Sequence, residues 1–343
     1  MKSLDSRHVL GYCVVAAMLA GCGGSQPPIG APGAELRSAP IGSANRRSSG
    51  DFLYPAGAVP SMRTDYSGRN LIYASTLGNE PVYVYTYPDA KMIGILNGPV
   101  GPRGMCVDRA SDIFIPFVYI PGGIYEFAHG GGTPIVYLGF PYDGENGCSI
   151  DPTTGNLAVV TGGDYKPALV VYHYKGLRGW GFAKSYTLPS MSNSAFCGYS
   201  NHGDLFVDGK DGSGAFALAE LSKGSKTFAT ISVSQSIKAP GQVQWDGTHL
   251  AIGDTGVSPS VIYQFDVSGS IAKKVGSTTL GDSAMVEQFW IQRGNVIAPD
   301  PKRSCGSGQA GCIAIYRYPA GGSAVKTIEL TGAFGATVSL APK

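Results

Sequence analysis

The 343-residue sequence has little charge and no long run of one sign. Only 15% of its residues are Asp, Glu, Lys or Arg, and the formal net charge is +2. Proteins that bind nucleic acid or an anionic membrane surface through their charge usually carry clustered basic residues. The composition therefore points to neither nucleic acid nor an anionic membrane surface as a partner.

Short catalytic motifs are also missing. The sequence contains no HExxH pair, no phosphate-cradling glycine loop and no nucleophile-elbow motif. Its five histidines are poorly placed for catalysis, because His8 precedes the mature chain, His129 and His202 fall in predicted turns, and His173 and His249 fall in predicted strands. We therefore assign no catalytic residue.

Long hydrophobic runs are absent as well, and the apolar run at the start, Val9–Ala20, is too short to span a bilayer. Basic residues precede it, and Leu19-Ala20-Gly21-Cys22 follows in the manner of a cleavage site. The segment resembles a bacterial lipoprotein signal, which implies a signal peptide over 1–21 and lipidation of Cys22. Gly23 after the cysteine resembles lipoproteins sent to the outer membrane. The alternative is an ordinary secretory signal with a chance cysteine.

Residues 22–60 are rich in Gly, Ser, Pro and Ala and show almost no apolar periodicity. Such a segment cannot bury enough surface to fold, so we predict a flexible tether. A proline-rich recognition segment is the alternative, but a dense PxxP pattern is missing. The expected location is therefore the cell envelope, with the lipid anchor as the contact with the membrane.

What the chain does contain is glycine and proline in abundance, 50 Gly and 23 Pro, with 43% hydrophobic residues. The stretch Pro102–Phe127 is typical of short alternating strands separated by Gly/Asp turns. The same order of segments recurs about every 46 residues. The equivalent positions are Asp108, Asp151, Ser200, Asp246, Gln292 and Ser339. This period predicts an all-β, six-bladed β-propeller over residues 61–343.

The first repeat lacks its innermost strand. Residues 70–97 supply three strands, and Gly335–Pro342 matches the missing pattern, so we predict that the carboxyl-terminal strand closes the ring. Met62–Asp65 is a shorter competitor for the same place.

The pattern PxGxxVD, DIFI and GIYEF resembles the NHL repeat and related six-bladed propellers, including the gluconolactonase-like group. The resemblance covers roughly residues 70–343 and concerns the fold more than the function. In the gluconolactonase-like group it implies a Glu, an Asn and an Asp around a divalent ion. That family places its Glu at the start of the first blade, where this chain has Phe334.

The cysteines that remain after residue 22 are odd in number. Cys305 and Cys312 flank a glycine-rich loop, which predicts a disulfide in an oxidising compartment. Cys148 and Cys197 occupy equivalent positions in neighbouring repeats, so they either bridge two blades or are simply small buried residues. Cys106 is one place out of step and is expected to be buried and inert. A three-cysteine metal cluster has no CxxC spacing to support it.

The ligand face of such a ring is formed by residues at the starts of first strands and the ends of second strands. On this rule the candidate ligand residues are Arg103, Asn146, Glu287, Asp254 and Asp300. The last four could hold calcium or magnesium, because carboxylate and amide oxygens suit hard cations. Alternatively, Asp254 and Asp300 only cap turns by binding backbone amides.

Two functions follow from these observations. The first is a lipid-anchored binding or interaction module, with an unknown protein, glycan or small molecule as ligand. The second is a metal-dependent, lactonase-like hydrolase that uses the same face. Only one carboxylate, Glu287, lies among the six positions at the starts of first strands, which favours the binding module. These positions are Arg103, Asn146, Ala195, Gly241, Glu287 and Phe334.

Overall fold

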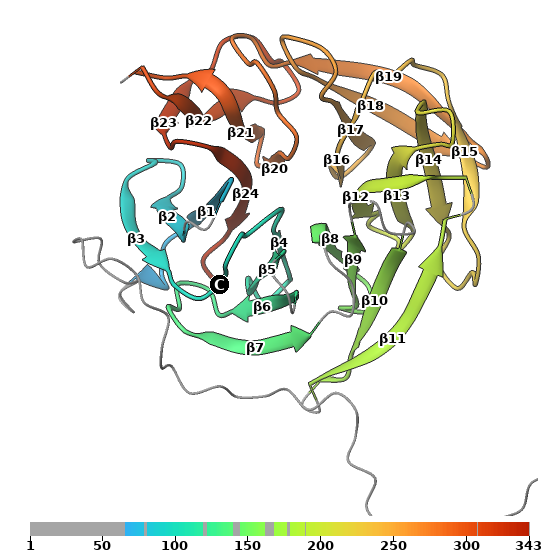
Figure 1. The fold of residues 1–343 in the computed structure, drawn as a ribbon, viewed down its shortest axis with the longest axis horizontal. Coiled ribbons are helices and arrows are strands. Elements are labelled where there is room, and N and C mark those ends of the chain that lie inside the picture. The colour runs from blue at the N-terminus through green and yellow to red at the C-terminus, as the bar shows by residue number, and fades with distance from the viewer. Residues whose placement is uncertain are drawn as a thin grey trace, which may run out of the picture. The chain divides into compact units, whose positions relative to one another are not determined.

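The computed structural model describes residues 66–78, 81–118, 122–139, 145–161, 168–176, 179–188, 190–306 and 308–342. The predicted signal peptide, Cys22, the predicted tether and the competitor strand Met62–Asp65 lie outside the described residues. The described part forms 24 strands, which are arranged as sheets around a common centre (Figure 1). No helix among these residues is long and apolar enough to cross a membrane. The protein thus has an all-β, propeller-like fold, as the repeats predict.

Four sheets have four strands each. The first contains β24 (Ala333–Ser339), β1 (Leu71–Thr76), β2 (Val82–Thr86) and β3 (Met92–Leu96). The second contains β4 (Cys106–Val107), β5 (Ile113–Phe117), β6 (Gly123–Phe127) and β7 (Pro134–Gly139). The third contains β8 (Glu145–Ile150), β9 (Leu157–Thr161), β10 (Ala168–Tyr174) and β11 (Trp180–Thr187). The last contains β20 (Trp290–Gln292), β21 (Asn295–Ser304), β22 (Ala310–Arg317) and β23 (Lys326–Glu329).

A fifth sheet has eight strands, made of two consecutive antiparallel meanders. One meander comprises β12 (Asn193–Tyr199), β13 (Leu205–Lys210), β14 (Phe216–Leu221) and β15 (Ala229–Val233). The other comprises β16 (Pro240–Trp245), β17 (Leu250–Asp254), β18 (Val261–Ser268) and β19 (Ile271–Thr279). Their outer strands are joined by a short parallel pairing of Ser232 with Ile271 and of Val233 with Ala272. The repeat pattern alone does not predict this junction.

The carboxyl-terminal strand completes the first sheet, as the sequence predicts. β24 pairs antiparallel with β1 from Leu71↔Ser339 to Thr76↔Ala333. The first sheet is therefore built from both ends of the described chain, and β1 has a partner on each edge. This pairing removes an open inner edge that would otherwise be free to pair with another chain.

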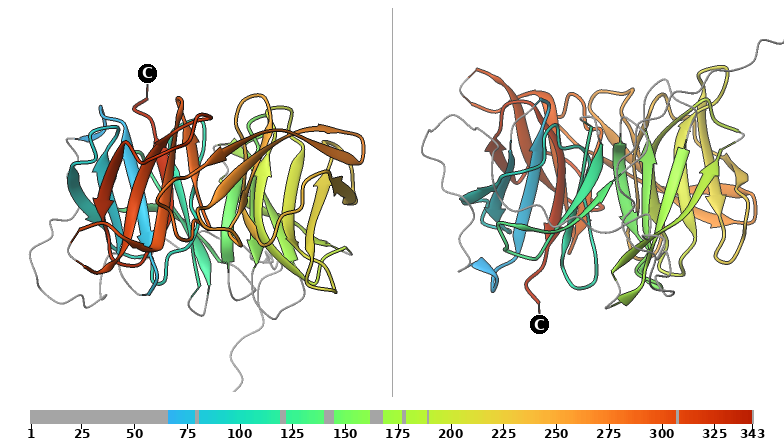
Figure 2. Two further views of the ribbon diagram at one scale, coloured as in Figure 1. Left: turned by 90° about the horizontal axis from the view of Figure 1, so that it is seen from above. Right: turned by 60° about the horizontal axis from the view of Figure 1, so that its bottom comes forward.

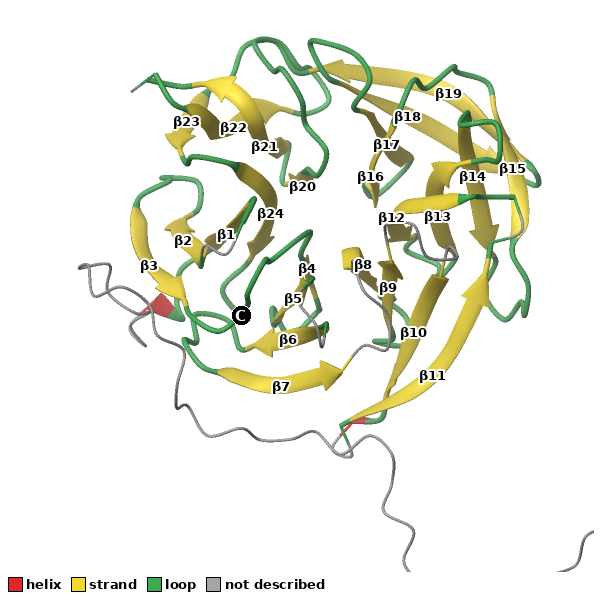
Figure 3. Cartoon of the chain, viewed as in Figure 1, coloured by secondary structure: helices red, strands yellow, loops and turns green. Residues whose placement is uncertain are grey.

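The core lies between the sheets, because successive side chains of a strand point to opposite faces. In β9, Leu157 and Val159 pack with the second sheet, whereas Ala158 and Val160 pack with β12 and β13. The inner strands are therefore apolar on both faces. Side views show the strands running between two sets of loops (Figure 2), and almost all of the described chain is strand or loop (Figure 3).

Turn residues fix the hairpins between first and second strands. Between β8 and β9, the carboxylate of Asp151 accepts hydrogen bonds from the main-chain N–H and hydroxyl of Thr153 and from the hydroxyl of Thr154. Gly155 follows at φ +78, a conformation that favours glycine. The predicted Asp-Pro-Thr-Thr-Gly turn therefore has a local chemical cause.

The disulfides differ from the prediction at one point. Cys305 and Cys312 are bonded, as the sequence predicts, but Cys148 is bonded to Cys106 and not to Cys197. Of the two alternatives for Cys148 and Cys197, the bridge between them is wrong, while Cys197 is a buried free cysteine. Cys106 is buried, as predicted, but the prediction that it is inert was wrong. The Cys148 sulfur lies 3.7 Å from the carbonyl oxygen of Phe114 in the preceding sheet.

The reason is the two-residue period of a strand. Cys148 and Cys197 occupy equivalent positions, so each points toward the sheet that precedes its own, and they cannot meet. Cys197 accordingly lies 3.9 Å from the carbonyl oxygen of Ala158. Cys106 is displaced by one residue and points the other way, toward Cys148, with the two Cα atoms 5.6 Å apart.

Candidate functional site

The starts of the innermost strands meet around the ring centre. The Gly104 N–H donates to the Asn146 carbonyl at 3.1 Å, and the Gln242 N–H donates to the Glu287 carbonyl at 2.8 Å. Each of these bonds links two neighbouring sheets. The sequence rule therefore brings these positions together.

A glutamine that the sequence analysis missed ties the centre together. Gln288 is fully buried, and its Nε2 donates to the Met105 carbonyl at 3.2 Å, while its Oε1 accepts from the Ala336 N–H at 2.9 Å. It thus connects the last, first and second sheets. The signal was available, since Gln288 and the buried Gln242 each follow a predicted first-strand position by one residue.

Two glycines permit this close approach. A Cβ on Gly104 would lie 2.7 Å from the Asn146 carbonyl oxygen, and a Cβ on Gly335 would lie 2.8 Å from the Arg103 carbonyl oxygen. Both distances are shorter than any side chain tolerates against backbone. The Ser75 hydroxyl fills the remaining space by donating to the Arg103 carbonyl at 2.9 Å and accepting from the Gly335 N–H at 3.0 Å.

Four side chains from these positions form what we call the central cluster: Arg103, Asn146, Glu287 and Phe334. The guanidinium of Arg103 lies over the Phe334 ring, 5.2 Å from its centroid. The Nε of Arg103 is buried and has no hydrogen-bond partner among the described residues. The Arg103 side chain is therefore held by stacking, with donor capacity left over.

Glu287 lies near the same guanidinium. Burial raises the pKa of its carboxyl, and the charges of Arg103 and Lys302 oppose that rise. The ion pairs found among the described residues involve other side chains. Glu287 and Arg103 therefore attract each other electrostatically over a longer distance, without a direct ion pair. Asn146, the remaining polar member, is partly exposed and contributes its main-chain carbonyl to the Gly104 N–H.

Asp254 and Asp300 have a different role. The Asp254 carboxylate accepts hydrogen bonds from the main-chain N–H groups of Lys238, Ala239 and Gly256. The Asp300 carboxylate accepts four, from the N–H groups of Ala284, Met285, Lys302 and Arg303. Both side chains are buried. Each aspartate therefore fastens the loop that leads into the first strand of its own meander, in line with the turn-capping alternative.

These contacts do not fit the divalent ion that the gluconolactonase-like resemblance implies. The four candidate donors do not converge, because Asp254 and Asp300 each use both carboxylate oxygens on backbone amides. Within the described residues, no group of three or more His, Cys, Asp or Glu side chains could hold a metal. We derive no chemistry through an ion at this site.

A third buried aspartate, Asp208, is not among the candidate ligand residues predicted from the sequence. Asp208 is fully buried; its Oδ1 accepts from the Phe196 N–H at 2.9 Å, and its Oδ2 has no partner in the described part of the chain. Burial raises its pKa well above the ordinary value. It lies one residue earlier in its strand than Asp254 and Asp300 do in theirs.

Comparison with known proteins supports the fold only. No protein-family model and no curated protein matches the chain. A chain of the nidogen/laminin complex is similar in structure, with a TM-score of 0.58 and 12% identity over 80% of this chain and 99% of that one.

Two proteins of unknown function are similar to a comparable degree. The one from Bacteroides caccae has a TM-score of 0.57 and 11% identity, covering 79% of this chain and 99% of that one. The one from Desulfotomaculum acetoxidans has a TM-score of 0.54 and 10% identity, covering 82% of this chain and 88% of that one. At these identities the likeness extends to a propeller-like all-β fold and no further.

Proposed function

We propose that this protein is a lipid-anchored binding module of the cell envelope, and that its ligand presents a carboxylate to Arg103 in the central cluster. The eight-stranded sheet counts as two blades in this proposal, which makes the ring six-bladed and gives each blade one first-strand position at the centre. Cys22 carries the lipid, and residues 22–60 act as the tether to the membrane, most simply the outer membrane.

The unsatisfied polarity of the central cluster supports the proposal. A guanidinium stacked on an aromatic ring presents a planar fork of donors, and a carboxylate is its geometric complement. The buried Nε of Arg103 has no partner among the described residues, so a ligand oxygen would satisfy it without breaking an existing bond. Asn146 and Glu287, at the starts of two other first strands, would offer an amide and a carboxylate to hydroxyl or amine groups beside that carboxylate.

Lys302 adds to this preference. Its charge acts on Glu287 together with that of Arg103, so two cations face one carboxylate at this end of the ring. Both cations would attract an anionic ligand to this end of the ring. A ligand with a carboxylate and a neighbouring hydrogen-bond donor uses all three groups.

The experiment is a binding assay on the chain without its first 22 residues. A thermal-shift screen with acetate, succinate, citrate, D-gluconate and D-glucuronate finds the best carboxylate, and calorimetry measures its Kd. Arg103→Gln should weaken binding about tenfold to a hundredfold, because a charge-assisted hydrogen bond contributes about 1.5–3 kcal/mol.

The matched control is Arg109→Gln, which removes the same charge from an exposed turn. Arg109→Gln should leave the Kd within about twofold, since screening weakens distant charges. Equal loss in both variants would reduce the effect to net charge, and no binding of any carboxylate by the wild-type protein would refute the proposal.

A further inference from the structure

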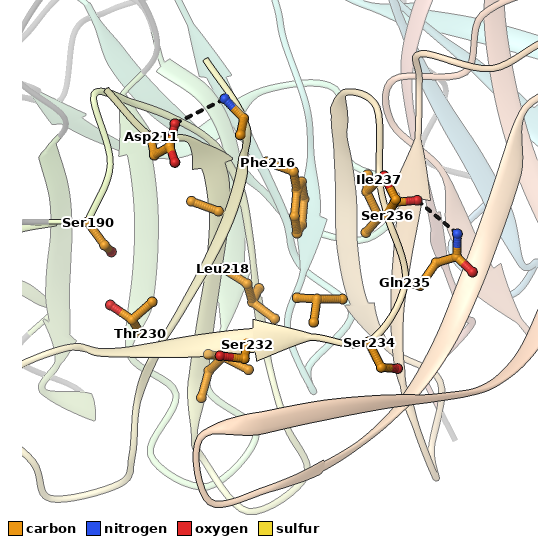
Figure 4. Close-up of a pocket in the computed structure, with 14 residues that line it drawn as sticks. Ser190, Asp211, Phe216, Leu218, Thr230, Ser232, Ser234, Gln235, Ser236 and Ile237 are labelled. Carbon is orange, nitrogen blue, oxygen red and sulfur yellow. Dashed lines mark hydrogen bonds between the residues drawn. The ribbon is translucent and has the colours of Figure 1, made fainter. Parts of the chain in front are cut away.

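A groove of about 670 Å³ lies at the outer side of the meander β12–β15, away from the central cluster. Figure 4 shows the side chains that line it, from β14, from β15 and from the loop that follows β15. It is independent of the site proposed above. The groove arises where β15 turns away from its own meander toward the following one.

β14 and β15 pair over three positions only, from Glu220↔Ala229 to Leu218↔Ile231. The next positions of β15, Ser232 and Val233, pair with β19 of the following meander. β15 therefore crosses from one meander to the other, and the first residues of β14 lose their outer partner. The groove fills the wedge between the two diverging strands.

Main-chain groups of both strands point into this wedge. The Asp211 N–H donates to the Ala215 carbonyl, so odd-numbered residues of β14 face β13 and even-numbered residues face outward. Phe216 thus directs its N–H and C=O toward the groove. On the other side, the Ser232 N–H donates to the Ser270 carbonyl at 2.8 Å, and the Ser234 N–H donates to the Ala272 carbonyl at 3.0 Å. The main-chain groups of Val233, between them, therefore point the other way, toward β14.

These four groups, the N–H and C=O of Phe216 and of Val233, have no hydrogen-bond partner among the described residues. In a continuous sheet they would bond to each other as the next pair of the ladder. Unpaired main-chain groups on a strand edge are a template for another strand. A segment of about four residues, inserted between β14 and β15, would reach both strands, because its successive residues point to opposite edges.

The side chains of the groove suit an extended peptide. Leu218, Ile231 and Ile237 are buried and form an apolar floor, and the hydroxyls of Thr230 and Ser232 stand along one wall. The charged residue among those that line the groove is an aspartate, Asp211.

Only one oxygen of Asp211 is used. Its Oδ1 accepts from the N–H and hydroxyl of Ser213 and from the N–H of Ala215, and Figure 4 shows it at the rim of the groove. The Ser213 hydroxyl and these amides lower the pKa of Asp211, so it is charged at neutral pH. The second oxygen can therefore pair with a basic side chain.

We propose that this groove binds an extended segment of a partner protein by strand insertion between β14 and β15, with a lysine or arginine of the segment on Asp211. The main-chain groups of Phe216 and Val233 supply affinity for any extended peptide. Asp211 and the apolar floor supply selectivity for a basic residue flanked by small or β-branched ones.

The test uses the pentapeptide Ac-TVKVT-amide and its analogue N-methylated at both valines and at the lysine. In an NMR titration of the protein, the unmodified peptide should shift the Phe216 and Val233 amides saturably and protect them from hydrogen exchange. The N-methylated analogue keeps every side chain but loses the donors, so it should bind at least about tenfold more weakly. Equal binding of both peptides, or no binding at about 1 mM, would overturn the proposal.

Two variants locate the contact. Val233→Pro removes an N–H that bonds to nothing in the described structure, and should lower the affinity for the peptide about tenfold. Val233→Ala keeps the N–H and should change the affinity less than threefold. Asp211→Asn should lower the affinity for Ac-TVKVT-amide, but not the affinity for the same peptide with glutamine in place of lysine. A concentration-dependent dimer without peptide, abolished by Val233→Pro, would make a second copy of this chain the occupant and contradict the proposal.

Discussion

Replacement of Asp300 by asparagine separates its two possible roles, loop anchor and metal ligand. The wild-type carboxylate accepts four main-chain N–H groups, three on Oδ1 and one, from Ala284 at 2.6 Å, on Oδ2. In Asp300→Asn the remaining oxygen best serves the three amides, and the new NH₂ group then faces the Ala284 N–H. One buried donor loses its acceptor and the other three bonds lose their charge.

The magnitude follows from these contacts. An unsatisfied buried donor costs about 1–3 kcal/mol, and charge-assisted hydrogen bonds are roughly twice as strong as neutral ones. We expect the free energy of unfolding to fall by about 3 kcal/mol in Asp300→Asn. At about 2–4 °C per kcal/mol for a domain of this order of size, the Tm should fall by about 6–12 °C. Added calcium should change neither the fall in the free energy of unfolding nor the fall in Tm.

The assay is thermal unfolding by circular dichroism, with and without calcium. Asp282→Asn is the matched control, because its side chain is 55% exposed and forms a surface ion pair with Arg303 at 3.6 Å. It should lower Tm by less than about 2 °C. An unchanged Tm in Asp300→Asn would refute the anchoring argument, and a calcium-dependent rise in the wild type that Asp300→Asn abolishes would restore the metal-dependent hydrolase.

Three further outcomes are expected. Deleting residues 335–343 should lower Tm strongly and expose the β1 amides to exchange, because β1 loses the partner that completes its sheet; an unchanged Tm would mean that Met62–Asp65 completes it. Burial raises the pKa of Glu126 to about 7, so the folded state keeps a proton that the unfolded chain has lost, and stability should fall as pH rises from about 4.5 to about 7. Glu126→Gln, which retains an acceptor for the Trp180 N–H, should gain Tm relative to the wild type across that range; a constant difference would contradict this. Cys22→Ser should release the protein from membranes, and its retention in a detergent-requiring fraction would disprove the lipid anchor.

Strands and ring closure could be predicted because they depend on local chemistry that repeats. The stretch Pro102–Phe127 contains the short strands β4, β5 and β6, as its pattern predicts, and β24 overlaps the predicted closing strand. Alternating β-branched and aromatic residues specify strands, and turn residues such as those around Asp151 specify where they end. The same repeat places Arg103, Asn146 and Glu287 at the centre.

Other features depend on the direction in which a side chain points and on the contacts between neighbouring strands. The Cys106–Cys148 bond follows from the alternation of side chains along a strand, which the one-residue offset of Cys106 in the repeat already indicates. The crossing of β15 to β19 could not be predicted, because it depends on how far two outer strands diverge in space. Spacing also cannot reveal that the carboxylates of Asp254 and Asp300 accept main-chain amides, while the Arg103 Nε has no partner in the part of the chain that the structure describes.

The central claim is that Arg103 is a ligand-binding side chain, and its Nε–H resonance tests this most directly. In the protein with ¹⁵N-labelled arginine, the resonance is assigned by its absence in Arg103→Gln and followed during a titration with the best carboxylate, then with calcium. The account predicts a saturable shift with the carboxylate, at the Kd found by calorimetry, and none with calcium. A shift with calcium and none with any carboxylate would contradict it.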